Sequence, residues 1–426
     1  MRKKEWVGLF VLFLVLVVLW SSVAFSQKLE LWTFVDTHAR WFREMAEKFS
    51  KEIDPQFSLD VKVFEYGAMH DKLLVALQTG IGAPDLADVE QGRFGGFLIG
   101  EIGFVDLTPR LKEGNYLEDI VESRLSLYAK DGKYYGVEHA LCPVVLYYRQ
   151  DLFEEAGINP EEIVTWDDFI KAGQKLTKED RFMVSLDNDA HEGAYLTILI
   201  RQRGGDWFDE AGNIQADSPL IIDTLKWLLD LRGVYHIAED PPIGPAFFGA
   251  LKEGRYATVI GADWYAGFMK DYCPELSGRW RVAPLPVWPD DPVKRRTSCF
   301  GGTGLTITRF CKDVDKAWEF VKFTMLSPEA NVRRYELTNL WPPLRSAWQD
   351  ERLYKPDPYF GNQVVGRVFA EVGTESPVQH QSPYLYLIHS TLWPQKYWPR
   401  VLEGEISPEE ALSSVAEEIR KEQGRR

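Results

Sequence analysis

Aromatic side chains at the ends of predicted strands are the clearest chemical signal in this sequence. The chain contains 15 Trp, 18 Tyr and 24 Phe, and Trp264 follows a Gly-Ala-Asp sequence that ends the apolar strand expected at 257–260. Open α/β sheets bind ligands at the carboxyl ends of their strands. An aromatic ring suits the C–H face of a sugar, whose hydroxyls require acids, amides and N–H groups. Core packing is the commoner role of any single aromatic residue, but the position of Trp264 favours a ligand. The other aromatics expected where strands end are Trp32, Phe34, Tyr66, Tyr265 and Trp341.

Motifs of common enzyme classes are missing from the sequence. It contains no P-loop, no H-E-x-x-H and no G-x-S-x-G, and the glycine cluster at 301–304 lacks the full dinucleotide-binding spacing. The seven histidines show no metal-ligand spacing. We therefore expect neither a cofactor nor a metal. Two carboxylates brought together by folding leave no fixed spacing, so a secreted carbohydrate-active enzyme that uses Glu90 and Glu192 remains the alternative.

The first residues have the pattern of an export signal. A basic opening at 2–4 precedes an apolar stretch at 7–20, and Ala24 and Ser26 are the small residues that signal peptidase requires. This pattern predicts a Sec-type signal peptide cut before Gln27 and a periplasmic or extracellular protein. An uncleaved helix is the alternative, because the apolar stretch approaches the length that spans a bilayer. It would tether the chain to the membrane, as in a sensor.

Charge and length narrow the remaining function classes. Cleavage removes three basic residues and one acidic residue, which takes the formal charge from −15 to −17. Such a surface repels phosphate, so nucleic acid is not an expected partner. About 400 residues predict two domains. The four cysteines permit a disulfide between Cys273 and Cys299, although buried free thiols are favoured in a chain of this size.

Apolar periodicity predicts alternating strands and helices. Residues 28–34 have the composition of a strand, and the spacing of Trp41, Met45, Phe49 and Ile53 predicts an amphipathic helix that lies on a sheet. Alternation of this kind is typical of a parallel, doubly wound sheet. Capping-box sequences begin two further helices, at Thr165 and at Ser407. The other expected elements are strands at 59–63 and 144–148, a third strand into which residues 82–89 lead, and helices at 69–78, 151–156, 194–202, 220–232 and 313–325.

Several sequence blocks, in this order and spacing, resemble the family 1 extracellular solute-binding proteins of ABC sugar importers. The blocks are Leu-Trp-Thr-Phe at 31–34, Tyr-Gly-Ala-Met-His-Asp-Lys-Leu at 66–73, Ala-Pro-Asp-Leu-Ala-Asp-Val-Glu at 83–90, Arg-Phe-Gly-Gly at 93–96, Gly-Lys-Tyr-Tyr-Gly at 132–136, Leu-Tyr-Tyr-Arg-Gln-Asp-Leu-Phe at 146–153, Thr-Trp-Asp-Asp-Phe at 165–169 and Gly-Gly-Thr-Gly at 301–304. The likeness covers about residues 28–345. Within the family the chain resembles the L-arabinose and arabino-oligosaccharide-binding proteins, chiefly through the first three blocks and His38.

The resemblance implies an α/β fold of the periplasmic-binding-protein type, with two doubly wound lobes joined by a hinge. After the signal peptide at 1–26, residues 27–141 and 303–347 would form the N-terminal lobe. Residues 142–302 and 348–426 would form the C-terminal lobe. The protein would act as a monomer that captures a neutral sugar or oligosaccharide of arabinose type and delivers it to the permease subunits of an ABC transporter.

Ligand contacts are implied where the family motifs match. Phe34 and His38 would come from the loop after the first strand. Glu90 would accept hydrogen bonds from sugar hydroxyls, and Trp264 would stack on the sugar. Gly301 and Gly302 would bring backbone N–H groups to the ligand at a crossover. Maltose-type relatives carry an arginine–aspartate pair after the strand that ends near residue 90. Because this chain has Gly92-Arg93 there, Arg93 is not expected to contact the sugar.

Overall fold

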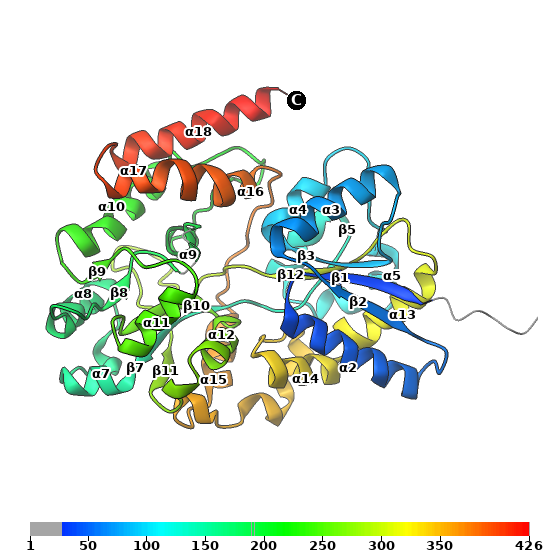
Figure 1. The fold of residues 1–426 in the computed structure, drawn as a ribbon, viewed down its shortest axis with the longest axis horizontal. Coiled ribbons are helices and arrows are strands. Elements are labelled where there is room, and N and C mark those ends of the chain that lie inside the picture. Colours follow the sequence, from blue (N-terminus) through cyan, green and yellow to red (C-terminus); the bar gives the residue numbers. More distant parts are fainter. Residues whose placement is uncertain (1–27, 189, 191, 426) are drawn as a thin grey trace, which may run out of the picture.

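A computed structural model describes residues 28–188, 190 and 192–425, which form two lobes side by side (Figure 1). The predicted signal peptide lies outside these residues. Within the described part of the chain, no helix is both long and apolar enough to cross a bilayer. Each lobe has a sheet with helices on its faces, as the alternating sequence pattern predicts.

The first lobe contains a five-stranded sheet in the order β2-β1-β3-β12-β6. Strand β1 pairs in parallel with β2 and β3, whereas β12 runs antiparallel to both β3 and β6. The parallel order predicted for the first three strands is therefore confirmed. β12 is the exception because it enters this lobe from the other one. The bounds are β1 Leu29–Thr33, β2 Leu59–Val63, β3 Leu86–Glu90, β6 Val137–Glu138 and β12 Thr303–Ile307.

Helix α2 (Asp36–Glu52) has the apolar face that its sequence predicts. Trp41, Met45 and Phe49 are buried in the core, where α2 packs against α13 (Val314–Met325). The prediction for Ile53 was wrong, because this residue caps the helix end and is 57% exposed. Helix α3 (Tyr66–Thr79) confirms the next predicted helix and begins one turn earlier.

The second lobe is built around the order β10-β7-β11, in which β7 runs antiparallel to both neighbours. Strands β8 and β9 pair in parallel. They form a separate two-stranded sheet beside β10, where the Thr258 amide donates to the Met183 carbonyl at 2.9 Å, just before β8. In both lobes the reversed strand is thus the one that arrives from the other lobe. The bounds are β7 Val144–Arg149, β8 Val184–Ser185, β9 Ala238–Glu239, β10 Thr258–Ala262 and β11 Trp280–Ala283.

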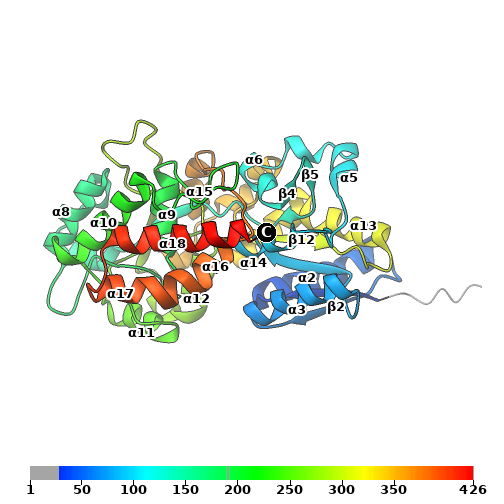
Figure 2. The same cartoon turned by 90° about the horizontal axis from the view of Figure 1, so that it is seen from above.

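Both predicted capping boxes are confirmed. Thr165 and Asp168 begin α8, and Ser407 and Glu410 begin α18, which lies across the second lobe beside α17 (Figure 2). The helices of this lobe are α7 Gln150–Glu155, α8 Trp166–Leu176, α9 Ala194–Gln202, α10 Pro219–Gly233, α11 Pro245–Glu253, α12 Tyr265–Tyr272, α15 Val365–Gly373, α16 Leu385–Leu387, a π-helix at Ile388–Tyr397, α17 Trp398–Leu402 and α18 Pro408–Gly424. Outside the second lobe lie the helices α4 Gln91–Phe97, α5 Thr108–Glu113, α6 Glu122–Leu125 and α14 Pro328–Thr338, and the short strands β4 Ala129–Lys130 and β5 Lys133–Tyr134.

Three chain segments meet where the lobes join. Pro143 and Cys299 form an antiparallel bridge, and the Leu141 amide donates to the Trp341 carbonyl at 2.9 Å. β12 and α13 contact elements of the first lobe, and α15 and α18 contact elements of the second. The family resemblance implies lobe boundaries at residues 141/142, 302/303 and 347/348. We retain those boundaries as a proposal.

All four cysteines are free thiols, so the alternative of a Cys273–Cys299 disulfide is not realised. Cys273 lies in the core against the Phe248 carbonyl. The Cys299 sulfur accepts hydrogen bonds from Arg124 and from Gln379 at the hinge. The two sulfurs thus have different surroundings in the fold. Three of the thiols are buried, as the sequence favours.

Candidate functional site

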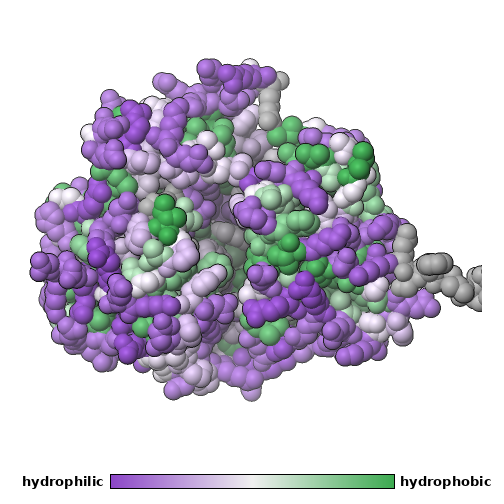
Figure 3. All heavy atoms as spheres, in the orientation of Figure 1, coloured by the Kyte–Doolittle hydropathy of each residue, from purple (hydrophilic) through white to green (hydrophobic). Residues whose placement is uncertain are grey.

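A cavity of about 310 Å³ lies between the lobes. The molecular surface is hollowed at this place (Figure 3). All six residues implied by the resemblance line it, which brings together parts of the chain far apart in sequence. They are Phe34, His38, Glu90, Trp264, Gly301 and Gly302.

Glu90 ends strand β3 and caps helix α4 with its own side chain. Its Oε2 accepts hydrogen bonds from the Gly92 amide at 2.8 Å, the Arg93 amide at 3.3 Å and the Tyr66 hydroxyl at 3.0 Å. All of these donors converge on one oxygen, which leaves Oε1 with the capacity to accept a ligand hydroxyl. Burial raises the pKa of Glu90, although the donors act in the opposite direction. The carboxyl is therefore held in place before any ligand arrives.

His38 belongs to a buried network of two imidazoles and one carboxylate. Its Nδ1 lies 2.8 Å from Asp88 Oδ2, and His139 Nε2 lies 2.6 Å from Asp88 Oδ1, with the two rings stacked at 4.4 Å. Burial raises the pKa of Asp88, but His139 and His38 outweigh it, so this pKa is lowered. Burial lowers the pKa of His139 to about 4. An ionised Asp88 is an acceptor only, so the facing ring nitrogens donate, and His38 Nε2 is the nitrogen available to a ligand.

The same three residues are the cluster of metal-ligand type found in the described part of the chain, with ligand atoms within 4.8 Å of one another. One nitrogen of each ring, His38 Nδ1 and His139 Nε2, is already hydrogen-bonded to Asp88. A metal would have to separate these hydrogen-bonded pairs. The arrangement fits a network that orients His38 better than it fits a metal site.

Trp264 stands at the start of α12, directly after β10. Its indole Nε1 donates to the Phe300 carbonyl at 3.2 Å, and its amide donates to Asp263 at 2.8 Å. Asp263 also accepts from the Trp341 amide at 2.7 Å. Gly301 has φ of +73°, and a Cβ there would lie 3.0 Å from the indole nitrogen. Glycine at 301 thus lets the crossover backbone approach the tryptophan closely.

Gly302 lies on the same crossover against a buried carboxylate. Its φ is +132°, and a Cβ would lie 2.7 Å from Glu138 Oε2 and 3.1 Å from Arg124 Nη1. Glu138 Oε1 accepts from the Thr303 amide at 2.7 Å and the His139 amide at 3.0 Å, so it joins two crossing segments. Burial raises the pKa of Glu138 to about 7, against the opposing effects of Arg124 and the amides.

Glu138→Gln should change the pH dependence of stability. In the unfolded chain Glu138 has an ordinary pKa of about 4.3. The folded state therefore binds more protons between pH 4.3 and 7, and this carboxyl makes the free energy of unfolding fall as the pH rises through that window. We expect the variant to gain about 2 to 3 kcal/mol over the wild type between pH 5 and pH 8. Urea unfolding at both values measures the difference. A constant difference would assign Glu138 an ordinary pKa.

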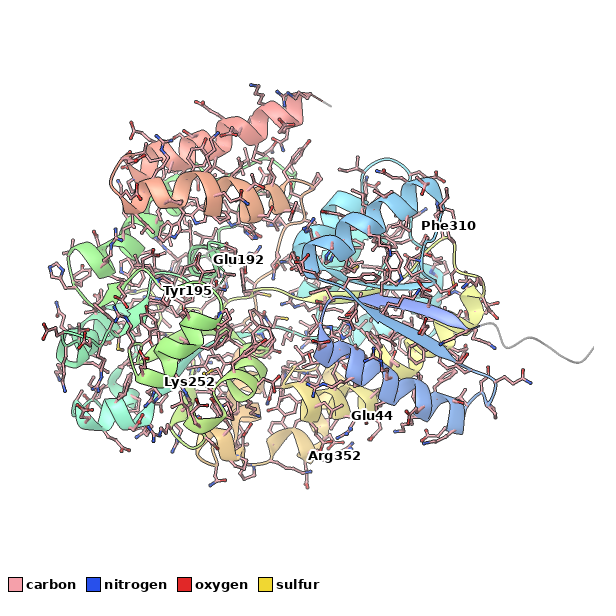
Figure 4. The ribbon with its side chains drawn as sticks, in the orientation of Figure 1. Glu44, Glu192, Tyr195, Lys252, Phe310 and Arg352 are labelled. Atoms are coloured by element: carbon pink, nitrogen blue, oxygen red, sulfur yellow. The ribbon has the colours of Figure 1, made fainter. Side chains whose placement is uncertain are left out.

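The remaining strand-end aromatics divide between cavity and core. Tyr66 lines the cavity, whereas Trp32, Tyr265 and Trp341 are buried and lie outside its lining. The strand-end position alone therefore does not identify a ligand contact. Glu192, the second carboxylate of the enzyme alternative, also lines the cavity, and Figure 4 places it on the side of the second lobe that faces the first.

Sequence reasoning did not select several other lining residues. Phe268 lies four residues after Trp264 on α12, with the two rings 5.4 Å apart. That helical spacing is the signal that could have found it. Tyr386 comes from α16, more than 100 residues away, and no local pattern marks it. Arg93 does not line the cavity, in agreement with the sequence expectation.

Residues 36–332 match the family described as bacterial extracellular solute-binding protein. The chain is 30% identical over 412 residues to the arabinooligosaccharide-binding protein of Halalkalibacterium halodurans, which covers 94% of this chain and 91% of that protein. It is 32% identical over 344 residues to the arabinooligosaccharide-binding protein of Bacillus subtilis, with coverage of 80% and 78%. A lactose-binding protein of Rhizobium radiobacter is 26% identical, with coverage of 83% and 84%.

Solved structures agree in fold. An ABC transporter associated binding protein from B. animalis subsp. lactis, in complex with β-1,6-galactobiose, has a TM-score of 0.75 at 20% identity and covers 93% of this chain and 98% of its own. An extracellular solute-binding protein family 1 structure has a TM-score of 0.77 at 18% identity, with coverage of 92% and 99%. The likeness confirms the two-lobe fold predicted from the sequence.

Proposed function

Because this chain belongs to the bacterial extracellular solute-binding proteins, we propose that it captures a neutral arabino-oligosaccharide outside the cytoplasmic membrane and delivers it to the permease of an ABC transporter. The observation that carries this proposal is the cavity between the lobes, where aromatic rings lie beside fixed hydrogen-bonding groups. The names of the two relatives at 30% and 32% identity support the ligand class.

We propose a distinct role for each predicted site residue. Trp264 would stack on one sugar face, with Phe34 on the opposite lobe. Glu90 Oε1 would accept a hydrogen bond from one sugar hydroxyl, and His38 Nε2 would accept a hydrogen bond from another. The backbone amides at 301 and 302 would donate to ring or hydroxyl oxygens. Glu90, His38 and Trp264 are held by hydrogen bonds within the protein, so little of the cost of ordering them falls on binding.

The proposal includes an exported monomer without enzymatic activity. Export by the signal peptide would place it where the permease can receive the ligand. The three hydrogen bonds to Glu90 Oε2 hold the carboxyl in place and leave Oε1 able to accept from a ligand hydroxyl, which suits a binding role.

Binding of defined sugars tests the proposed function. Calorimetric titration with arabinose, arabinotriose and β-1,6-galactobiose should give a measurable dissociation constant for arabinotriose, and a thermal shift should accompany it. A ligand at 100 times its dissociation constant adds about 2.7 kcal/mol of apparent stability. New reducing ends on prolonged incubation with arabinotriose would instead support the enzyme that uses Glu90 and Glu192.

Ligand should favour a closed form of the two lobes. The candidate contacts come from both lobes, so a sugar that touches all of them binds the closed arrangement better than an open one. Small-angle X-ray scattering should therefore show a smaller radius of gyration with saturating arabinotriose. An unchanged profile at saturation would contradict closure on the ligand.

Affinity should depend little on ionic strength. A neutral sugar held by hydrogen bonds and stacking exchanges no counterions on binding. Titration in 20 mM and 500 mM NaCl should give dissociation constants within about twofold. A steep loss of affinity with salt would point to a charged ligand, such as a uronic acid oligomer.

A further inference from the structure

Arg93 lies outside the cavity but contacts two aromatic residues that line it. Its guanidinium carbon is 3.2 Å from the centre of the Tyr386 ring and 5.2 Å from that of Tyr66. Tyr66 begins α3 in the first lobe, whereas Tyr386 lies in α16, next to the π-helix that packs on α18 in the second. One buried cation therefore contacts an aromatic wall from each lobe.

The backbone of α4 makes close contacts with residues 381–382, which lie just before α16. The Gln381 side-chain amide donates to the Gln91 carbonyl at 2.9 Å. A Cβ on Gly95 would lie 2.4 Å from the Ser382 carbonyl oxygen, so the two backbones approach as closely as glycine allows. This contact between the lobes occurs on the helix whose N-cap is Glu90.

The guanidinium is fixed by few other partners. Arg93 is 8% exposed, and its Nη1 donates to Asp71 at 3.0 Å. Its buried Nε has no hydrogen-bond partner among the described residues. Burying an arginine with an unsatisfied nitrogen is costly. The ion pair with Asp71 and the two ring faces offset this cost, and of these contacts the Tyr386 face is the one that requires α16 to lie on α4.

We propose that Arg93 is a positioning residue, which raises ligand affinity by holding Tyr66 and Tyr386 together across the two lobes. It does not contact the sugar. Removal of its cation loosens α16 from α4 and reduces the population of the arrangement that binds. The inference relies on the proposed function only for its ligand measurement.

Calorimetry with arabinotriose tests the coupling. Arg93→Met, which keeps an apolar stem, should weaken binding at least fivefold, and so should Tyr386→Leu. The double variant should be no weaker than the worse single variant, because both remove the same contact. In a Tyr386→Phe background, which keeps the ring face, Arg93→Met should retain its effect. Effects that multiply in the double variant, or a dissociation constant of Arg93→Met within twofold of wild type, would overturn the proposal.

Arg203→Met is the matched control. Arg203 lies 4.8 Å from the Trp288 ring in the second lobe and outside the cavity lining, so the same substitution should leave the affinity unchanged. A fivefold loss in this control as well would mean that removing any such cation acts on binding through general stability, and would overturn the specific role of Arg93.

Hydrogen exchange in the ligand-free protein gives a measurement independent of the sugar. Arg93→Met should speed amide exchange at 381–388 at least fivefold, while Arg203→Met should not. Unchanged exchange at this segment would overturn the inference. If the wild type binds none of the sugars but the exchange result holds, the proposed ligand fails and the role of Arg93 in holding the lobes together stands.

Discussion

Trp264→Ala is expected to weaken carbohydrate binding by roughly ten- to 150-fold, which corresponds to the loss of about 1.4–3 kcal/mol of aromatic contact. The indole is half-buried at the cavity, and its nitrogen is already bonded to the Phe300 carbonyl, so the ring is presented in a fixed orientation. Its removal takes away the stacking surface and leaves the backbone of α12 in place. Calorimetric titration of the variant with arabinotriose measures the loss.

Trp166→Ala is the comparison for a tryptophan of the core. Trp166 is fully buried in the second lobe, away from the cavity, and its truncation should cost about 3–5 kcal/mol of stability. Trp264→Ala should cost less, about 1–2 kcal/mol, because its ring is partly exposed. Near-normal affinity together with a core-sized loss in the urea midpoint would assign Trp264 to packing alone.

Gly302→Ala is expected to lower the free energy of unfolding by about 2–4 kcal/mol and to weaken binding about tenfold or more. Two effects combine at this position. The φ of +132° strains any residue with a side chain, and the new Cβ would lie 2.7 Å from Glu138 Oε2. Glu138 cannot move aside freely, because its other oxygen accepts hydrogen bonds from the amides of Thr303 and His139. The crossover must shift instead, and the site shifts with it.

Gly132→Ala is a control at a glycine with positive φ and no neighbouring contact. Gly132 has φ of +74°, and a Cβ there would meet nothing within 4 Å. Its substitution should cost about 1 kcal/mol and leave binding intact. Urea unfolding of both variants measures the difference. Equal losses at 132 and 302 would show that the contact with Glu138 adds nothing.

The sequence predicts the local elements of this protein well, because they depend on residues close together in the chain. The Trp41, Met45 and Phe49 spacing gives α2 its buried face. The Thr165 and Ser407 capping boxes start α8 and α18 where the side chains satisfy the first amides. Position after a strand selected Trp264, which does line the cavity. The same rule selected Trp32 and Trp341, which lie in the core, because strand ends border both environments.

Only the tertiary structure decided which distant residues meet. Tyr386 lies near Arg93 because the chain, after forming most of the second lobe, passes along the edge of the first lobe. No sequence periodicity predicts that path. The reversed direction of β7 and β12 follows from the crossovers between lobes. The pKa values of Glu138 and His139 depend on burial, which a sequence does not state. Short-range order is determined by neighbouring side chains along the chain. The site is a product of long-range packing, in which each lobe supplies one wall and the hinge fixes their approach.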